Sequence, residues 1–125
     1  MASGTAGMAQ LLELKERPTA VLCANDEMAF GAVRALHQHA LTVPGDVSIV
    51  GFDDLNMAAF YNPPLTTVHI PRHELGRHAA LQLIEQIEGR AVKEETILPT
   101  RLVIRESTAP PRHSSRGKAA RSPTR

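Results

Sequence analysis

Two short polar stretches carry the residue types with the most evident binding chemistry. Residues 25–27, "NDE", directly follow an apolar run at 19–24, and residues 53–54, "DD", directly follow an apolar run at 47–52. An amide offers both a hydrogen-bond donor and an acceptor, whereas a carboxylate offers two acceptor oxygens. This combination suits the hydroxyls of a sugar or the ring N–H groups of a purine, if the fold brings the two stretches together.

The elements around these stretches are predicted to bring them to one edge of a sheet. The runs 19–24 and 47–52 are short and uniformly apolar, which predicts strands of a parallel sheet that are buried on both faces. Residues 26–40 have helical spacing, so strand, helix and strand form a βαβ unit. Because ligands of open α/β sheets bind outside the carboxyl ends of the strands, Asn25 and Asp53 can converge on one small molecule.

Helix capping is the competing interpretation of the same polar residues. Asn and Asp are preferred N-cap residues, and acidic side chains in the first turn interact favourably with the helix dipole. Both interpretations can hold together, with Asp26 capping the helix while Asn25 faces a ligand. The sequence alone leaves this choice open.

Further elements are predicted on both sides of this unit. They are a helix over 8–16, a short helix over 54–60, a third strand over 66–70, an amphipathic helix over 72–88 and one or two strands over 96–105. Pro18 stops the first helix, and Gly89 suits the position just past the end of the amphipathic one. The predicted fold is therefore α/β, a parallel sheet with flanking helices.

The charge of the chain is unevenly distributed. Five of the 14 basic residues and none of the 13 acidic residues lie in residues 109–125, so residues 1–108 carry about −4 while the whole chain carries +1. We expect one domain over 1–108 and a disordered basic tail over 109–125, because the tail has almost nothing apolar to bury. The tail could contact nucleic acid or an anionic surface, but a solvated extension is the simpler interpretation.

The composition argues against several classes of function. The four aromatic residues are too few for the stacking platforms of a single-strand nucleic-acid binder. The six histidines lack the converging spacing of a zinc site, so neither a metal nor another cofactor is expected. Asp53 and Asp54 are adjacent on a strand and point to opposite faces, and Cys23 lies in an apolar strand without an evident partner. We therefore expect no enzyme activity.

The sequence also bears on the compartment. No apolar run approaches the roughly 18 residues of a membrane-spanning helix. The N-terminus lacks the basic and apolar regions of a secretory signal. A cytoplasmic location without a membrane partner is the expectation.

Four stretches follow one another at intervals typical of a known family. They are "RPTAVLCANDEMAFGAVRAL", "VPGDVSIVGFDDLNMAAFYNPPLTTV", "ELGRHAALQLIEQIEG" and "LVIRESTAPP". Their combination, which runs from about Gly4 to Pro111, resembles the C-terminal part of bacterial transcription regulators of the lactose-repressor/galactose-repressor (LacI/GalR) family.

The resemblance implies an incomplete periplasmic-binding-protein-like (Rossmann-like) subdomain and a sugar-like effector in the cleft between two subdomains. By position, Asn25 and Asp53 match residues that contact the effector in the family, and Phe30, Phe60 and Tyr61 match residues of the dimer interface. The implied function is the effector-binding and dimerisation portion of a sugar-responsive repressor. Its implied partners are a small-molecule effector, a second copy of the chain and operator DNA.

Helical spacing also predicts that these aromatic residues are exposed. Phe30 lies about 100° from the Ala29–Val33 stripe that faces the sheet, and Phe60 and Tyr61 precede two prolines at the end of a short helix. An exposed apolar patch usually marks a partner surface, and in a two-fold dimer it would meet its own copy. The competing interpretation is that all three aromatic side chains belong to the core.

The resemblance does not extend to every part of the family. Nothing in the chain resembles a helix-turn-helix or a hinge helix, most of the N-terminal subdomain has no counterpart, and Ile70 stands where the family usually has Gln. We therefore expect a fragment that reaches operator DNA only through a missing N-terminal domain. The alternatives are a sugar-binding transport module of the periplasmic-binding-protein type and a protein that only dimerises.

Overall fold

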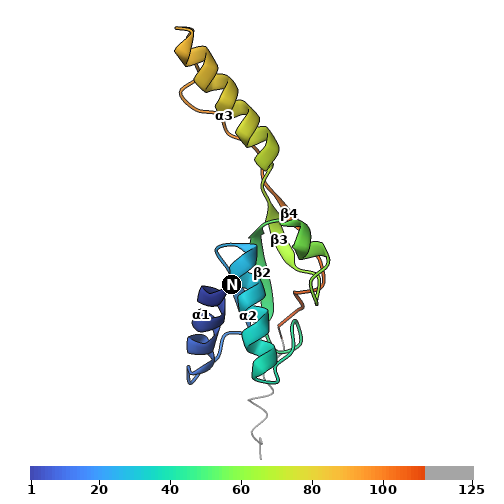
Figure 1. Cartoon of the computed structure of the whole chain (residues 1–125). Coiled ribbons are helices and arrows are strands. Elements are labelled where there is room, and N and C mark those ends of the chain that lie inside the picture. Colours follow the sequence, from blue (N-terminus) through green and yellow to red (C-terminus); the bar gives the residue numbers. More distant parts are fainter. Residues whose placement is uncertain (112–125) are drawn as a thin grey trace, which may run out of the picture.

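A four-stranded, mostly parallel sheet organises residues 1–111, the part of the chain that the computed structural model describes (Figure 1). The strands are β1 (Ala20–Leu22), β2 (Ser48–Asp53), β3 (Thr66–His69) and β4 (Arg101–Val103), in that spatial order. The helices are α1 (Ala2–Leu12), α2 (Asp26–Gln38), the short 3₁₀ helix η1 (Asn56–Ala59) and α3 (Arg72–Ile87). The predicted α/β class is confirmed.

The three predicted parallel strands are neighbours in the sheet. Leu22 pairs with Val50 and Val50 with Thr66, both in parallel register, so the predicted βαβ unit is present. β4 runs antiparallel to β3, with Val103 opposite Thr67. The sheet is therefore mixed at this edge, where the chain returns from α3.

The core lies between the sheet and α2. Ala29, Val33 and Leu36 form the predicted apolar stripe of α2 and are at most 1% exposed. They belong to one cluster with Ile49 of β2. The amphipathic pattern of α2 therefore determines which side of the helix meets the sheet.

α1 packs directly against α2. Thr5 Oγ1 donates a hydrogen bond to the Gly31 carbonyl over 3.1 Å. A Cβ on Gly4 would lie only 2.0 Å from the carbonyl oxygen of Met28. The two helix backbones can approach this closely because Gly4 has no side chain.

Two elements near the N-terminus differ from the prediction. The helix predicted over 8–16 begins and ends earlier, as α1. The prediction that the first strand is buried on both faces is wrong, because Leu22 is 72% exposed and Ala20 is also exposed. β1 has a single neighbour at the edge of the sheet, and its alternate side chains point away from α2.

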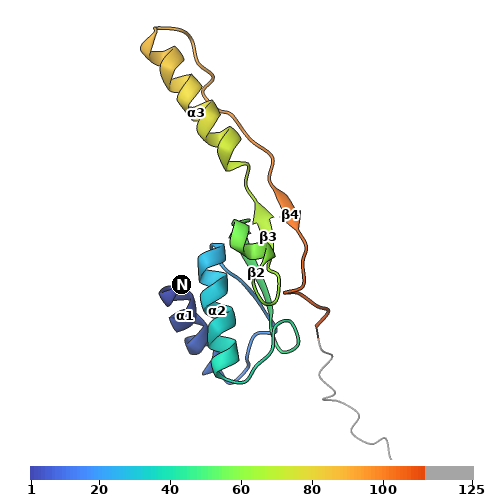
Figure 2. The ribbon, with the colours of Figure 1, turned by 45° about the vertical axis from the view of Figure 1, so that its right-hand side comes forward.

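α3 and the segment that returns from it extend away from the rest of the described chain in both views (Figures 1 and 2). The predicted helix is present, but no residue of it is buried, and Leu83, Ile84 and Ile87 are 58%, 48% and 76% exposed. The return segment is held alongside it by Gln82, whose Nε2 donates to Thr96 Oγ1 over 2.9 Å. Within residues 1–111 the apolar stripe of α3 therefore has no core to face.

The end of the described chain is bonded to the sheet. The Ala109 N–H donates to Ser48 Oγ over 3.1 Å, and Ser48 Oγ donates to the Ala109 carbonyl over 3.3 Å. Ala109 is the first residue of the predicted tail, and residues 112–125 of that tail lie outside the described part. None of the helices in residues 1–111 has the length and apolar character needed to cross a membrane.

The close approach of α1 to α2 predicts opposite outcomes for two glycine substitutions. Gly4→Ala should lower the free energy of unfolding by about 1–3 kcal/mol, because the new Cβ meets the backbone of Met28. The matched control is Gly7→Ala in the same helix, where nothing lies within 4 Å and helix propensity should add up to about 1 kcal/mol. Urea denaturation followed by circular dichroism measures both. Equal changes in the free energy of unfolding for the two variants would contradict the close packing of α1 against α2.

Candidate functional site

Asn25 is the N-cap of α2. Its backbone is extended, with φ −156° and ψ 169°, and Oδ1 accepts a hydrogen bond from the Met28 N–H over 2.8 Å. The capping interpretation is thus confirmed for Asn25. Because the cap uses Oδ1 alone, the Nδ2 group is not required for it.

Asp26 points into the molecule instead of capping the helix. Its side chain is fully buried, Oδ1 accepts from Thr67 Oγ1 over 2.6 Å, and Oδ2 accepts from the Leu55 N–H over 2.8 Å. The interpretation in which Asp26 caps while Asn25 does not is therefore wrong. The physical reason is that Gly51 of β2, which has no side chain, leaves room for the Asp26 carboxylate. A Cβ on Gly51 would lie 2.1 Å from Asp26 Oδ1.

Both polar stretches leave the sheet at the same edge, as predicted. Leu22 pairs with Val50, and Asn25 and Asp53 each follow three residues later. Both residues are half-buried. Joint contact of their side chains with a ligand stays a prediction.

β2 ends in a strained turn. Asp53, its last residue, has φ +114°, and Asp54 has φ +53°. Such conformations cost roughly 1–3 kcal/mol for each non-glycine residue, and they persist where surrounding contacts hold them, often at binding sites. The backbone at Asp53 is therefore fixed by its neighbours rather than by its own preference.

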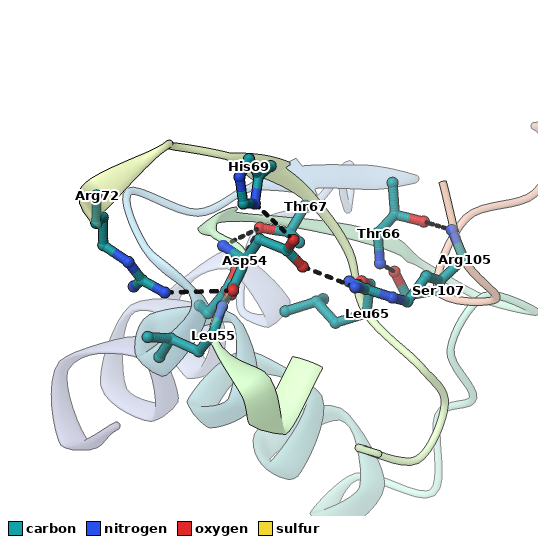
Figure 3. Close-up of polar contacts among 10 residues, drawn as sticks. Asp54, Leu55, Leu65, Thr66, Thr67, His69, Arg72, Arg105 and Ser107 are labelled. Carbon is teal, nitrogen blue, oxygen red and sulfur yellow. Dashed lines mark hydrogen bonds and ion pairs between the residues drawn. The ribbon is translucent and has the colours of Figure 1, made fainter. Parts of the chain in front are cut away.

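Asp54 is the centre of a polar cluster beside this turn (Figure 3). Its Oδ1 lies 2.7 Å from Arg105 Nη2, and its Oδ2 lies 2.9 Å from His69 Nδ1. Arg72 Nη2 also donates to the Asp54 carbonyl over 3.4 Å. Burial raises the pKa of the Asp54 carboxyl, but the hydrogen bonds and charges of Arg105 and His69 together lower that pKa below its ordinary value.

The stretch "RES" at 105–107 bonds the chain after β4 to β2 and to the start of β3, a role that the sequence did not reveal. Ser107 Oγ donates to the Ile49 carbonyl over 2.6 Å and accepts from the Thr66 N–H over 2.8 Å. Arg105 Nη1 donates to the Leu65 carbonyl over 2.7 Å. Hydroxyl groups at 66, 67, 107 and 108 were the available signal, but their pairing depends on strands that are distant in sequence.

Two hollows lie near the carboxyl edge of the sheet. One of about 340 Å³ is lined by Leu22, Cys23, Ala24 and Phe52. Another of about 300 Å³ is lined by Asp54, Leu55, Asn56, Ala59, Phe60 and Arg105. Neither hollow is lined by Asn25 or Asp53, so the expected crevice shared by these two side chains is not one of them.

Reactive and metal-binding groups are scarce in the described residues. Burial raises the pKa of the Cys23 thiol, which disfavours the thiolate that a nucleophile requires. Among residues 1–111, no group of three or more His, Cys, Asp or Glu side chains could hold a metal ion.

The expected exposure of Phe30 is wrong. Its side chain is 2% exposed, and its ring lies 4.4 Å from that of Tyr61, measured between centroids. Tyr61 is half-buried and its hydroxyl donates to the Phe30 carbonyl over 3.0 Å. α1 and the segment after η1 cover this side of α2, which helical spacing within one element cannot reveal. Phe60, in contrast, is 88% exposed as predicted.

Comparison with known proteins reveals a family and a curated relative. The periplasmic binding protein-like domain family matches residues 2–108. The transcriptional repressor CytR of Escherichia coli (strain K12) is 44% identical over 107 residues, which are 85% of this chain and 31% of CytR. The chain thus spans about a third of the length of this relative.

Solved structures have the same fold. A Lac repressor dimer bound to operator and the anti-inducer ONPF matches with a TM-score of 0.80 and 41% identity, over 86% of this chain and 37% of that one. A LacI family transcriptional regulator from Enterococcus faecium with bound ribose matches with a TM-score of 0.80 and 38% identity, over 87% and 40%.

The Asp54 cluster predicts a specific acid dependence of stability. Because the folded-state pKa of Asp54 is lowered, its contribution is complete above the ordinary value of 3.8 and is lost as pH falls through the folded-state pKa. Asp54→Asn should lower the free energy of unfolding by roughly 1–3 kcal/mol at pH 7, and this difference should shrink below pH 3.8. Urea titrations from pH 7 to pH 2.5 measure it.

The control for the Asp54 titration is Glu16→Gln, which removes an exposed carboxylate. Its effect should stay within about 0.5 kcal/mol, as is usual for surface substitutions. A difference between wild type and Asp54→Asn that is independent of pH would contradict the role of the carboxylate charge.

Proposed function

The chain belongs to the LacI family of transcription regulators through its periplasmic binding protein-like domain, and we propose that it forms the effector-binding and dimerisation portion of a repressor. The repressors of this family are regulators and not enzymes. The observation that carries the proposal is the placement of Asn25 and Asp53 at equivalent positions beyond two adjacent parallel strands. Ligands of open α/β sheets bind at this edge.

The proposed effector is a sugar or a sugar derivative. Asn25 retains an Nδ2 donor beyond its cap, and Asp53 offers carboxylate acceptors, a pair that matches hydroxyl groups. The Enterococcus faecium relative with bound ribose supports this class. The strained backbone at Asp53 is a further support, because strain of this kind is concentrated at ligand-binding positions.

The proposed interface between two copies is centred on Phe60. Phe60 is 88% exposed and Met57 is 54% exposed, and both belong to the segment around η1. Large exposed apolar side chains that lie together often mark a partner surface. Phe30 and Tyr61 would support this surface from within the subunit, because Tyr61 directly follows Phe60 and its ring packs on that of Phe30.

The proposal also includes operator DNA as a partner of the assembly and the cytoplasm as its location. The Lac repressor dimer of known structure is bound to operator, and we propose that this chain acts in the same kind of assembly. A sugar-binding transport module and a dimerisation-only protein are the alternatives. The repressor CytR as a relative favours the regulator over both.

A ligand titration tests the effector site. Ribose and galactose should be titrated to high concentration into the ¹⁵N-labelled chain. We expect weak binding, because most of the N-terminal subdomain that would complete the cleft has no counterpart here, and a ligand of the proposed class should shift the amide signals of both 25–27 and 53–55. Asp53→Ala should weaken the binding at least about tenfold, because a hydrogen bond to a charged group contributes roughly 1.5–3 kcal/mol. Asp46→Asn, in the loop before β2, is the control and should bind normally. Unchanged affinity in Asp53→Ala would contradict the proposed contact.

Sedimentation tests the proposed interface. The wild-type chain should self-associate at micromolar concentrations, and Phe60→Asp should weaken association about tenfold or more, because it places a charge in the apolar centre of the interface. Leu14→Asp, which changes an exposed leucine outside this segment, should leave association unchanged. A wild-type chain that sediments as a monomer at high micromolar concentration would refute the interface.

A further inference from the structure

We propose that Asp26 is a positioning residue that couples the two stretches bearing Asn25 and Asp53, an inference that rests on the proposed function of this edge. Asp26 directly follows Asn25 in the chain. Its carboxylate reaches the turn that follows Asp53, because Oδ2 accepts from the Leu55 N–H over 2.8 Å. One side chain therefore joins both halves of the proposed effector contact.

The turn after β2 is held at two successive backbone amides. The Leu55 N–H donates directly to Asp26 Oδ2. The Asp54 N–H donates to Thr67 Oγ1 over 3.4 Å, and Thr67 Oγ1 in turn donates to Asp26 Oδ1 over 2.6 Å. Asp26 thus accepts from the Leu55 amide directly and is linked to the Asp54 amide through Thr67. These two amides belong to the two residues that follow the strained Asp53.

The burial of Asp26 shows that its role differs from that of a helix cap. Asn25 already supplies the cap of α2. Asp26 is 0% exposed, and both of its oxygens are satisfied by groups outside α2. Gly51 leaves the space for this carboxylate, because any Cβ there would lie 2.1 Å from Oδ1.

This arrangement explains how Asp53 keeps an unfavourable φ of +114°. A strained residue relaxes unless its neighbours are fixed. Here the residues on its C-terminal side are fixed to α2 and β3 through Asp26 and Thr67. Removing an acceptor from Asp26 should therefore release the turn, reorient Asp53 and weaken ligand binding, while the cap at Asn25 remains.

The variants are chosen to separate positioning from general stability. Asp26→Asn removes the negative charge and replaces one acceptor oxygen by an NH₂ donor, so the two charge-assisted bonds from Leu55 and Thr67 become weaker neutral ones, or the bond with Thr67 reverses direction. Thr67→Val removes the hydroxyl that relays between Asp54 and Asp26, whereas Thr67→Ser keeps it. Asp46→Asn is a matched control, because Asp46 Oδ2 likewise accepts from a backbone N–H and a threonine hydroxyl, those of Thr42, over 2.8 and 2.6 Å.

The experiment measures the conformation of Asp53 by NMR on the full 125-residue chain. The ¹³Cα and ¹³Cβ shifts of Asp53 report its φ, and hydrogen exchange at Leu55 reports the bond to Asp26. In Asp26→Asn and Thr67→Val we expect exchange at Leu55 to accelerate at least tenfold relative to the buried Val33, with altered Asp53 shifts. Thr67→Ser and Asp46→Asn should keep the wild-type Asp53 shifts and the wild-type ratio of exchange rates.

A ribose titration of the same samples separates the two proposals. Release of the turn in Asp26→Asn and Thr67→Val supports the inference, and weaker ribose binding in these variants adds its functional consequence. Unchanged Asp53 shifts and Leu55 exchange in both variants overturn it, even when ribose binds the wild-type chain. If ribose and galactose shift no amide signal at 25–27 or 53–55 of the wild-type chain, the proposed sugar contact is overturned instead, whatever the state of the turn.

Discussion

The architecture of the polar edge depends on the two hydrogen bonds that the Asp26 carboxylate accepts. This carboxylate is fully buried, and each oxygen accepts a short hydrogen bond from a different part of the chain. A buried carboxylate without such partners is strongly destabilising, so α2, β3 and the turn after β2 must meet in one arrangement. Asn25 can then act as the cap, and position 51 must be glycine-sized.

A second carboxylate also holds this turn. Asp54 is bonded to His69 at the end of β3 and to Arg105 just after β4, the two segments through which α3 is attached to the rest of the chain (Figures 1 and 3). Arg105 also donates to the Leu65 carbonyl. The turn between Asp53 and Leu55 is thus held both by the buried carboxylate of Asp26 and by the Asp54 cluster. Its position is defined by both.

The elements with strong local patterns could be predicted from the sequence, whereas their environments could not. The stripe of α2 and the strand at Thr66–His69 have spacing that needs no tertiary information. The exposure of Leu22 and the burial of Phe30 depend on which elements cover them, and nothing nearby in the sequence encodes that cover. The burial of Asp26, which the sequence suggested as a possible cap, could not be predicted for the same reason, because its partners lie 29 and 41 residues away.

The proposed effector edge and the proposed interface share one rigid segment. From Asp53 the chain runs through Leu55, which Asp26 holds, and through Ala58, whose carbonyl accepts from the Leu65 N–H over 2.7 Å. It then reaches Phe60 at the surface and Tyr61, which is bonded to α2. Because Asn25 is the N-cap of α2, both ends of this segment are fixed to the helix that carries the proposed ligand-binding amide at its start. A ligand at the proposed effector edge would therefore act on the same segment that bears Phe60, the centre of the proposed interface.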